Sequence, residues 1–247
     1  MVAINSVSWY FAHVVTTTFL LLYVYITIKE KSAFLAGLFL AGAFLTRIST
    51  SLGVFFFLGY RLFTKEKPAK KRFLQLLYFS IPIIGGILLF FAYNYARFEN
   101  IMETGYTFQL LYPELVGNRT IGTWNLKHFP TNLYLFFIKT PEFVFKEGTF
   151  ITSSIKPTYI GMSFLYTSPI FLHLIRINLK ERINLISLTT ASFISLFLFG
   201  SFGLGAYQYG YRFALDFQPF LFLALTKIFE IITGYTRFGS IRGFNFL

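Results

Sequence analysis

Long apolar runs separated by short polar links dominate this chain. A helix needs about 20 apolar residues to cross roughly 30 Å of hydrocarbon. Five runs reach or approach that length, at residues 9–28, 73–93, 160–175, 183–202 and 213–232. The pattern therefore predicts a chain that crosses a membrane several times through helices.

Two further apolar runs, at residues 33–45 and 48–63, are each too short to cross upright at about 1.5 Å per residue. We expect two short, tilted or re-entrant helices with a turn at residues 46–51. Gly37 and Ala41 lie one helical turn apart, and small residues at this spacing let another helix approach closely.

Residues 94–159 form a long, more polar segment that we expect outside the membrane. Within it, residues 133–138 are apolar but far too few to span, which favours a helix in the membrane interface, closed by Pro141. The predicted fold is all-α: one integral membrane domain over residues 1–247, a polytopic transmembrane helical bundle with short tilted helices and an outer interfacial segment.

The positions of the charges indicate an orientation. Threading the apolar runs back and forth puts the basic links on one side of the bilayer and most acids on the other. This is the positive-inside pattern, so we expect the basic links to be cytoplasmic and residues 94–159 to lie on the outer face. The host membrane is expected to be the plasma membrane if the source is prokaryotic. The basic links contain Lys29, Lys31, Arg61, Lys65, Lys67, Lys70, Lys71, Arg72, Arg176, Lys180, Arg182, Arg237 and Arg242.

The composition agrees with a membrane protein. Apolar residues make up 55% of the chain and charged residues only 13%, against about 25% charged in soluble domains. A net charge of +12 in a soluble protein would suggest a nucleic-acid partner. Here the inner links account for it, so we expect the bilayer as partner and no nucleic acid. The absence of cysteine excludes disulfides and thiol chemistry.

The first candidate for chemistry is the stretch 94–106, directly after a predicted span. Arg97 has a planar fork suited to phosphate, and Glu103 could orient a sugar hydroxyl or act as a base. Aromatic residues, including Tyr106, lie between them. The alternative is an interfacial cap, in which the rings occupy the headgroup region and Arg97 pairs with Glu99 or with a lipid phosphate.

The second candidate is the stretch 209–220, which opens the last predicted span. Arg212 and Asp216 are four residues apart, so on an α-helix they would share a face and could pair. Asp216 is the only aspartate of the chain. An ionisable group within a membrane usually faces a polar cavity or a partner, so a binding role and a purely structural pair both remain open.

The third candidate is the stretch 42–47, where Arg47 ends the first short helix. Its cation could meet a lipid phosphate in the same outer cavity, or extend to the headgroups without a specific role. The three histidines are scattered without metal-ligand spacing, so we expect no metal site. His13, inside the first span, either lines a cavity or is a packed, hydrogen-bonded histidine.

These three stretches, in this order, resemble the GT-C class of polytopic glycosyltransferases, in the branch of protein O-mannosyltransferases and bacterial aminoarabinose transferases. Residues 42–47 are similar to the family's GLAFLTR sequence. Residues 94–106 are similar to NYLRFGNPFETGY, and residues 210–220 to GYRYLLDLLPF. The resemblance covers essentially the whole chain, as the latter two thirds of such an enzyme.

The resemblance implies transfer of a sugar from a polyprenyl-phosphate donor to an acceptor, of unknown identity, on the outer face. Arg212 and Arg47 would hold the donor phosphate and neutralise its growing charge. Arg97, Glu103, Tyr106 and Asp216 would contact the sugar or the acceptor. We expect no cofactor and no metal, because arginine supplies the positive charge.

The chain also departs from the family. The acidic residue of the family's first outer loop has no counterpart, because residues 1–93 contain only Glu30 and Glu66, both on the predicted inner side. Either this chain is a piece of a longer enzyme, or it has lost catalysis and is a non-catalytic subunit that binds lipid-linked sugar. A transporter or flippase is a third class, which would need more ionisable groups near the midplane. The catalytic residue is thus unknown.

Overall fold

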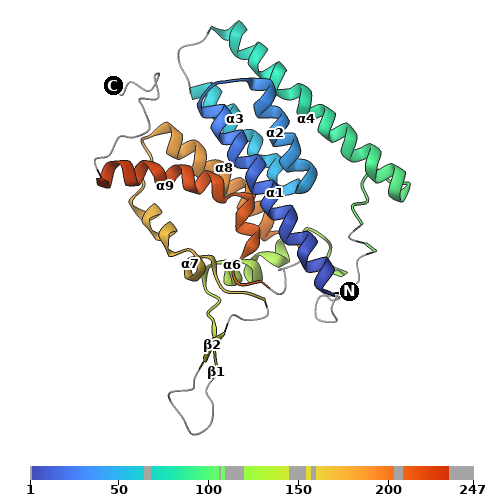
Figure 1. The fold of residues 1–247 in the computed structure, drawn as a ribbon, viewed down its shortest axis with the longest axis vertical. Helices are drawn as coiled ribbons and strands as arrows, with labels where there is room; N and C mark the ends of the chain where they lie inside the picture. Colours follow the sequence, from blue (N-terminus) through green and yellow to red (C-terminus); the bar gives the residue numbers. More distant parts are fainter. Residues whose placement is uncertain are drawn as a thin grey trace. The chain divides into compact units, whose positions relative to one another are not determined.

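The computed structural model describes residues 2–63, 68–105, 107–108, 120–144, 154–156, 160–202 and 208–233. The described chain is an all-α bundle apart from one short two-stranded ribbon (Figure 1). It divides into two compact units. Unit 1 holds residues 1–108, 173–194 and 215–247, and unit 2 holds 109–172 and 195–214. The sequence predicts one domain over 1–247, and this stays a prediction.

Unit 1 is built first from α1 (Val2–Ile28), which contains a stretch long and apolar enough to cross a membrane at residues 10–28. A tight turn follows, with Glu30 in the left-handed region at φ +50°. Ser32 then caps α2 (Ala33–Thr46) by accepting a hydrogen bond from the Leu35 N–H.

The predicted pair of short helices is confirmed, with the break at Arg47. The Arg47 backbone is extended at φ −151°, ψ 114°, which ends α2. The 3₁₀ helix η1 (Ile48–Gly53) follows and leads into α3 (Val54–Phe63). Both apolar pieces are shorter than a full span.

α4 (Ala69–Phe98) is the longest helix and is long and apolar enough to cross the membrane. Its close partner is α2, and the contact runs along small residues as predicted. A Cβ on Gly37 would lie 2.1 Å from the Phe79 carbonyl oxygen, and one on Gly86 would lie 3.1 Å from the Ala41 Cβ. Glycine therefore permits the two backbones to meet.

The core of unit 1 is aromatic. The Phe57 and Phe79 rings stack at 3.9 Å between centroids, and Phe220 packs against Phe56 at 5.4 Å. Tyr23 is completely buried, yet its hydroxyl is satisfied: it donates to the Gly53 carbonyl at 2.8 Å and accepts from the Phe57 N–H at 2.9 Å. This one side chain joins α1 to the start of α3.

Unit 2 contains η2 (Leu126–His128), α6 (Phe129–Phe137), β1 (Glu142–Val144), β2 (Ser154–Lys156) and α7 (Phe164–Thr167). The strands pair antiparallel. The short helix predicted at 133–138 is present as the end of α6. Phe136 is central to a small ring cluster with Phe164, Phe199 and Tyr211.

One predicted span is wrong as a single helix. Residues 160–175 form the four-residue α7 and the 3₁₀ helix η4 (Pro169–Arg176) instead. Ser168 is non-helical at φ −142°, ψ 63°, and Pro169, which has no N–H to donate, disfavours a helical conformation of the residue before it, so the α-helix ends here. Gly161, at φ +98°, adds a turn upstream.

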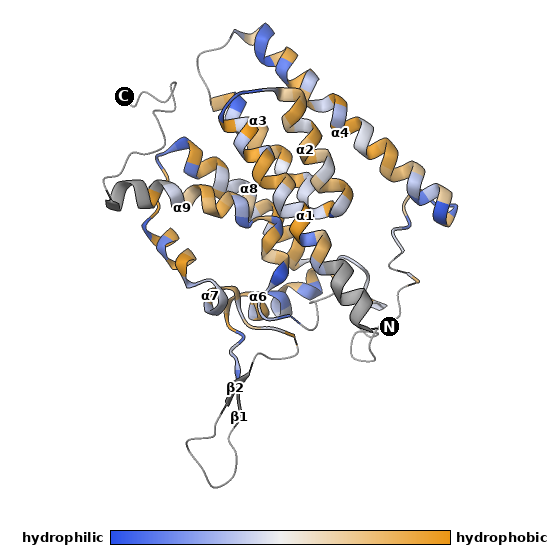
Figure 2. Cartoon of the chain, viewed as in Figure 1, coloured by the Kyte–Doolittle hydropathy of each residue, from blue (hydrophilic) through white to orange (hydrophobic). Residues whose placement is uncertain are grey.

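The last two predicted spans differ in outcome. Residues 183–202 correspond to α8 (Arg182–Phe199), which is long and apolar enough to cross. Residues 213–232 instead comprise the 3₁₀ helix η5 (Arg212–Asp216) and the 16-residue α9 (Gln218–Thr233). Three described helices thus have the length and composition of membrane spans, and the chain is an integral membrane protein. Apolar residues cover these helices along most of their length (Figure 2).

Candidate functional site

The most distinctive polar group of unit 1 is Asp216, which is completely buried at the end of η5. The Arg47 Nε lies 2.6 Å from its Oδ1 and 2.7 Å from its Oδ2. Ser49 donates its hydroxyl to Oδ2 at 2.5 Å, and the His13 Nδ1 lies 3.5 Å from Oδ1. We call these four residues the Asp216 cluster.

The break between α2 and η1 places two members of the cluster. Because Arg47 is extended, its side chain leaves the helix axis, while the first turn of η1 presents Ser49 two residues later. The Thr46 hydroxyl lies 2.6 Å from the Thr16 hydroxyl, and this contact ties the end of α2 to α1 near His13. The polar sequence at residues 46–51 is therefore used for tertiary contacts.

The electrostatics of the cluster follow from its burial. A buried carboxylate is costly unless a cation and further donors satisfy it, and here Arg47 supplies the charge and Ser49 a second donor. His13 and Asp216 are at most 1% exposed, whereas the Arg47 side chain is 17% exposed. An anion that approached the cluster would therefore meet Arg47 first.

The chemistry open to Asp216 is limited by these contacts. Its Oδ2 accepts hydrogen bonds from Arg47 and Ser49, and its Oδ1 lies 2.6 Å from the Arg47 Nε, so Asp216 is committed mainly to this ion pair. It can fix the orientation of the Arg47 guanidinium, whose planar shape suits phosphate.

The predicted Arg212–Asp216 pair is not formed, because the partner of Asp216 is Arg47. The two residues lie on a 3₁₀ helix, where residues three apart align and residues four apart do not. Arg212 is buried in unit 2, with its guanidinium 5.6 Å from the Phe213 ring. Its predicted role at the donor phosphate stays a prediction.

Arg97 lies in the last turn of α4, where its guanidinium covers the Phe98 ring at 4.9 Å and donates to the Tyr93 hydroxyl at 3.2 Å. The ion pair between Arg97 and Glu99, one of the two considered for an interfacial cap, is not formed among the described residues. This arrangement matches an aromatic interfacial cap, and a role for Arg97 in sugar binding stays a prediction.

Glu103 lies in the turn after α4. Its Oε2 accepts from the Thr107 hydroxyl at 2.6 Å and its Oε1 from the Gly105 N–H at 2.7 Å. These hydrogen bonds, led by the one from Thr107, lower the pKa of the Glu103 carboxyl below its ordinary value. Its carboxylate holds a local turn. Tyr106, the third predicted residue here, lies outside the described residues.

The sequence did not reveal the role of His13. It was expected either to line a cavity or to pack as an ordinary buried histidine, and the structure brings it to the carboxylate of Asp216. Its position inside an apolar span was the only available signal. Ser49 was overlooked because serine is common at any turn.

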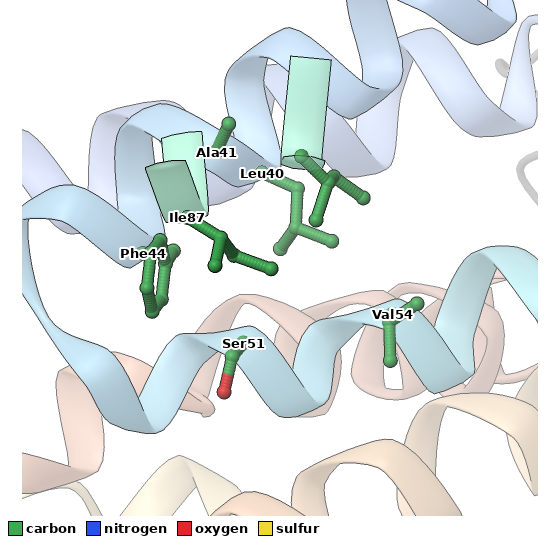
Figure 3. Close-up of a pocket in the computed structure, with 7 residues that line it drawn as sticks. Leu40, Ala41, Phe44, Ser51, Val54 and Ile87 are labelled. Atoms are coloured by element: carbon green, nitrogen blue, oxygen red, sulfur yellow. The ribbon is translucent and has the colours of Figure 1, made fainter. Parts of the chain in front are cut away.

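An apolar cavity of about 50 Å³ lies beside η1, between α2, α3 and α4 (Figure 3). Ser51 supplies the one polar side chain of its lining, so the cavity cannot recognise a sugar or a phosphate and is typical of a dry packing gap. Its lining residues are Leu40, Ala41, Phe44, Ser51, Val54, Ile83 and Ile87.

Within the described part of the chain, no group of three or more histidine, aspartate or glutamate side chains is arranged to hold a metal ion. In comparisons with known proteins, no family model, no curated protein and no solved structure matches the chain.

Proposed function

We propose that this protein is a membrane glycosyltransferase, or part of one, that takes a sugar from a polyprenyl-phosphate donor and transfers it on the outer face. The supporting observation is the contact between Arg47 and Asp216, at 2.6 Å across 169 positions of sequence. It joins two of the three stretches on which the family resemblance rests. Arg47 and Asp216, which are far apart in sequence, thus meet at one polar site.

In this proposal, Arg47 binds the donor phosphate and Asp216 positions it. As the glycosidic bond breaks, negative charge grows on the departing phosphate, and a guanidinium held in place stabilises that charge without reorganising. Asp216, which itself accepts a hydrogen bond from the Ser49 hydroxyl, fixes the position of the guanidinium through its Nε. Asp216 therefore acts through Arg47, and we assign it no contact with the sugar.

The orientation proposed from the charges places the basic links in the cytoplasm, in the plasma membrane of a prokaryotic source. The sugar and acceptor would then meet the chain at residues 94–159, near Arg97, Glu103 and Tyr106. The acceptor and the residue that activates it are left unassigned.

A second function has a specific observation in its favour. The carboxylate of the Asp216 cluster is paired with Arg47, and Asp216 is the one acid among the four residues of this cluster. A site whose arginine can bind phosphate and whose single carboxylate is committed to that arginine could bind a lipid-linked sugar without transferring it. The alternative is therefore a non-catalytic membrane subunit with the same ligand.

Phosphate recognition is tested by binding of decaprenyl phosphate and decaprenol to the detergent-solubilised chain. We expect the wild type to prefer the phosphate at least about tenfold, since a charge-assisted pair contributes about 1.5–3 kcal/mol. Arg47→Gln should abolish this preference, while Lys127→Gln, an exposed lysine of unit 2, should retain it. Equal binding of phosphate and alcohol by the wild type would refute both functions.

The two functions are separated by incubating the chain with decaprenyl-phosphate mannose carrying a radiolabel. Transfer of label to any acceptor, lost in Arg47→Gln, supports the enzyme. Binding of the donor without transfer in membranes of the source cell supports the non-catalytic subunit.

A further inference from the structure

A group of exposed basic side chains in unit 1 plays no part in the proposed site. We call it the basic rim, and it comprises Lys29, Lys31, Lys70, Lys71 and Lys180. These residues come from the end of α1, the start of α4 and the approach to α8. None of them forms an ion pair with a described residue.

Two hydrogen bonds from side chains to backbone carbonyls show that the end of α1, α3 and the start of α8 meet. The Tyr60 hydroxyl of α3 donates to the Ile28 carbonyl at the end of α1, at 3.2 Å. The Arg182 Nη1, in the first turn of α8, donates to the Phe63 carbonyl at the end of α3, at 2.8 Å. Lys29, Lys31 and Lys180 are therefore on the same end of unit 1.

The start of α4 lies at this end too. Gly37 of α2 faces Phe79, and Ala41, one turn later, faces Gly86, so α2 and α4 run in the same direction. The first turn of α4 therefore extends beyond the start of α2, at the end where α1 turns into α2. Figure 2 shows hydrophilic residues at both places.

The positive charge of this end is not balanced by acids of the described chain. Glu30 pairs with the buried Arg61 at 3.3 Å, and Glu181 accepts a hydrogen bond from Asn184 at 3.3 Å. Neither α4 nor α8 has an acid in its first turn. Lys70 and Lys71 therefore stand at the positive end of the α4 dipole, where an anion would be favoured.

One aromatic contact favours a position of the rim at the depth of lipid headgroups. The Lys31 ammonium lies 4.9 Å from the centre of the exposed Tyr25 ring, a lysine–tyrosine pair of the kind that marks a membrane interface. Along α4, Arg72 and Arg97 are separated by about 38 Å at 1.5 Å per residue, enough to put each in a headgroup layer.

We propose that the basic rim binds the headgroups of anionic phospholipids and so retains these lipids around one end of unit 1. The ligand is the phosphate of a lipid such as phosphatidylglycerol. Each exposed basic group beside an anionic surface favours association, and salt screens this contribution. This inference is independent of the proposed enzymatic function.

The test reconstitutes the full chain in phosphatidylcholine vesicles and measures, by electron spin resonance, the association of spin-labelled phosphatidylglycerol relative to spin-labelled phosphatidylcholine. We expect the wild type to favour phosphatidylglycerol at least about threefold, and high salt to reduce this preference. Lys70→Gln with Lys71→Gln should lower the ratio by about half or more. Lys70→Arg with Lys71→Arg should restore it.

The matched control is Lys127→Gln with Lys139→Gln, which removes two lysines of unit 2 and should leave the ratio unchanged. Circular dichroism verifies that each variant keeps its helical content. A wild-type ratio near one would overturn the proposal and direct the search to an acidic protein partner. An equal fall in the rim and control variants would also overturn it, because net charge rather than the rim would then be responsible.

Discussion

Asp216 illustrates how much one buried residue depends on its surroundings. In sequence it is a single acid four residues after an arginine, and that arginine is the obvious partner. The 3₁₀ geometry of η5 turns the two apart, and the break at Arg47 supplies another cation. The residue type predicted a charged partner correctly, but the partner itself came from a distant segment.

We predict that Asp216→Ala lowers the free energy of unfolding by about 3–5 kcal/mol, because it leaves the Arg47 cation without its counter-ion in a largely buried site. Denaturant titration in detergent micelles measures this loss. Arg47→Met combined with Asp216→Ala should cost less than the sum of the two single changes. Strict additivity of the two substitutions would show that the pair is not coupled.

The turn at Glu103 should respond to acid. Its hydrogen bonds, that of Thr107 first, lower the pKa of the folded carboxyl below the ordinary value of 4.5. The stabilisation of the turn is therefore complete above about pH 4.5 and is lost as the pH falls through the lowered pKa. Carboxyl carbon NMR follows this titration directly.

Thr107→Val is the matched variant for this turn, because it removes the hydroxyl donor and keeps the branched shape. The Glu103 pKa should rise toward its ordinary value in this variant. An unchanged pKa would mean that the side-chain hydrogen bond does not hold the carboxylate.

At the scale of elements, the sequence predicted that a helix would pack closely against α2. Gly37 and Ala41 at one-turn spacing indicated a face for close packing, and α4 occupies it. Which helix would pack there could not be read from the spacing, because a small-residue face accepts any partner of suitable shape.

Gly37→Ala should lower the free energy of unfolding by about 1–3 kcal/mol, because the new methyl group would collide with the Phe79 carbonyl, a backbone atom that cannot move alone. Gly85→Ala is the control on α4 itself, where an added Cβ meets no atom within 4 Å. It should be neutral or slightly stabilising, since alanine favours a helix over glycine. Comparison of the two midpoints in detergent checks the prediction, and equal midpoints would contradict it.

In the segment 160–176, the apolar pattern did not predict the helices that form. Hydropathy alone favoured a span there, whereas Ser168 and Pro169 interrupt the backbone and divide it into α7 and η4. The backbone conformation overrode composition here, because Ser168 before Pro169 is non-helical and Pro169 has no N–H to continue the helix.

At the scale of the whole molecule, the charge pattern predicts opposite sides for the basic links and the segment 94–159. Because the chain has no cysteine, a maleimide can label only a cysteine that is introduced by substitution. Lys180→Cys should be protected from a membrane-impermeant maleimide in intact cells, and Lys127→Cys should be labelled. Labelling of both, or the reverse pattern, would overturn the predicted orientation.

The sequence by itself determined the class of the molecule: an integral membrane protein, helical, with basic residues gathered in its links. These properties depend on local composition and run length, since a bilayer requires helices with satisfied backbones and apolar surfaces. The local sequence likewise predicted the break near Arg47 and the short helix at the end of α6.

Only the tertiary structure decided which polar groups meet. Arg47 and Asp216 approach because α2 and η1 turn back beside α1 and η5, and His13 joins them from a face of α1 that its own sequence did not distinguish. A hydrogen-bonded ion pair requires its donor and acceptor atoms to lie within about 3 Å of one another. The partners in such a pair therefore depend on how distant segments pack, which no local pattern in the chain encodes.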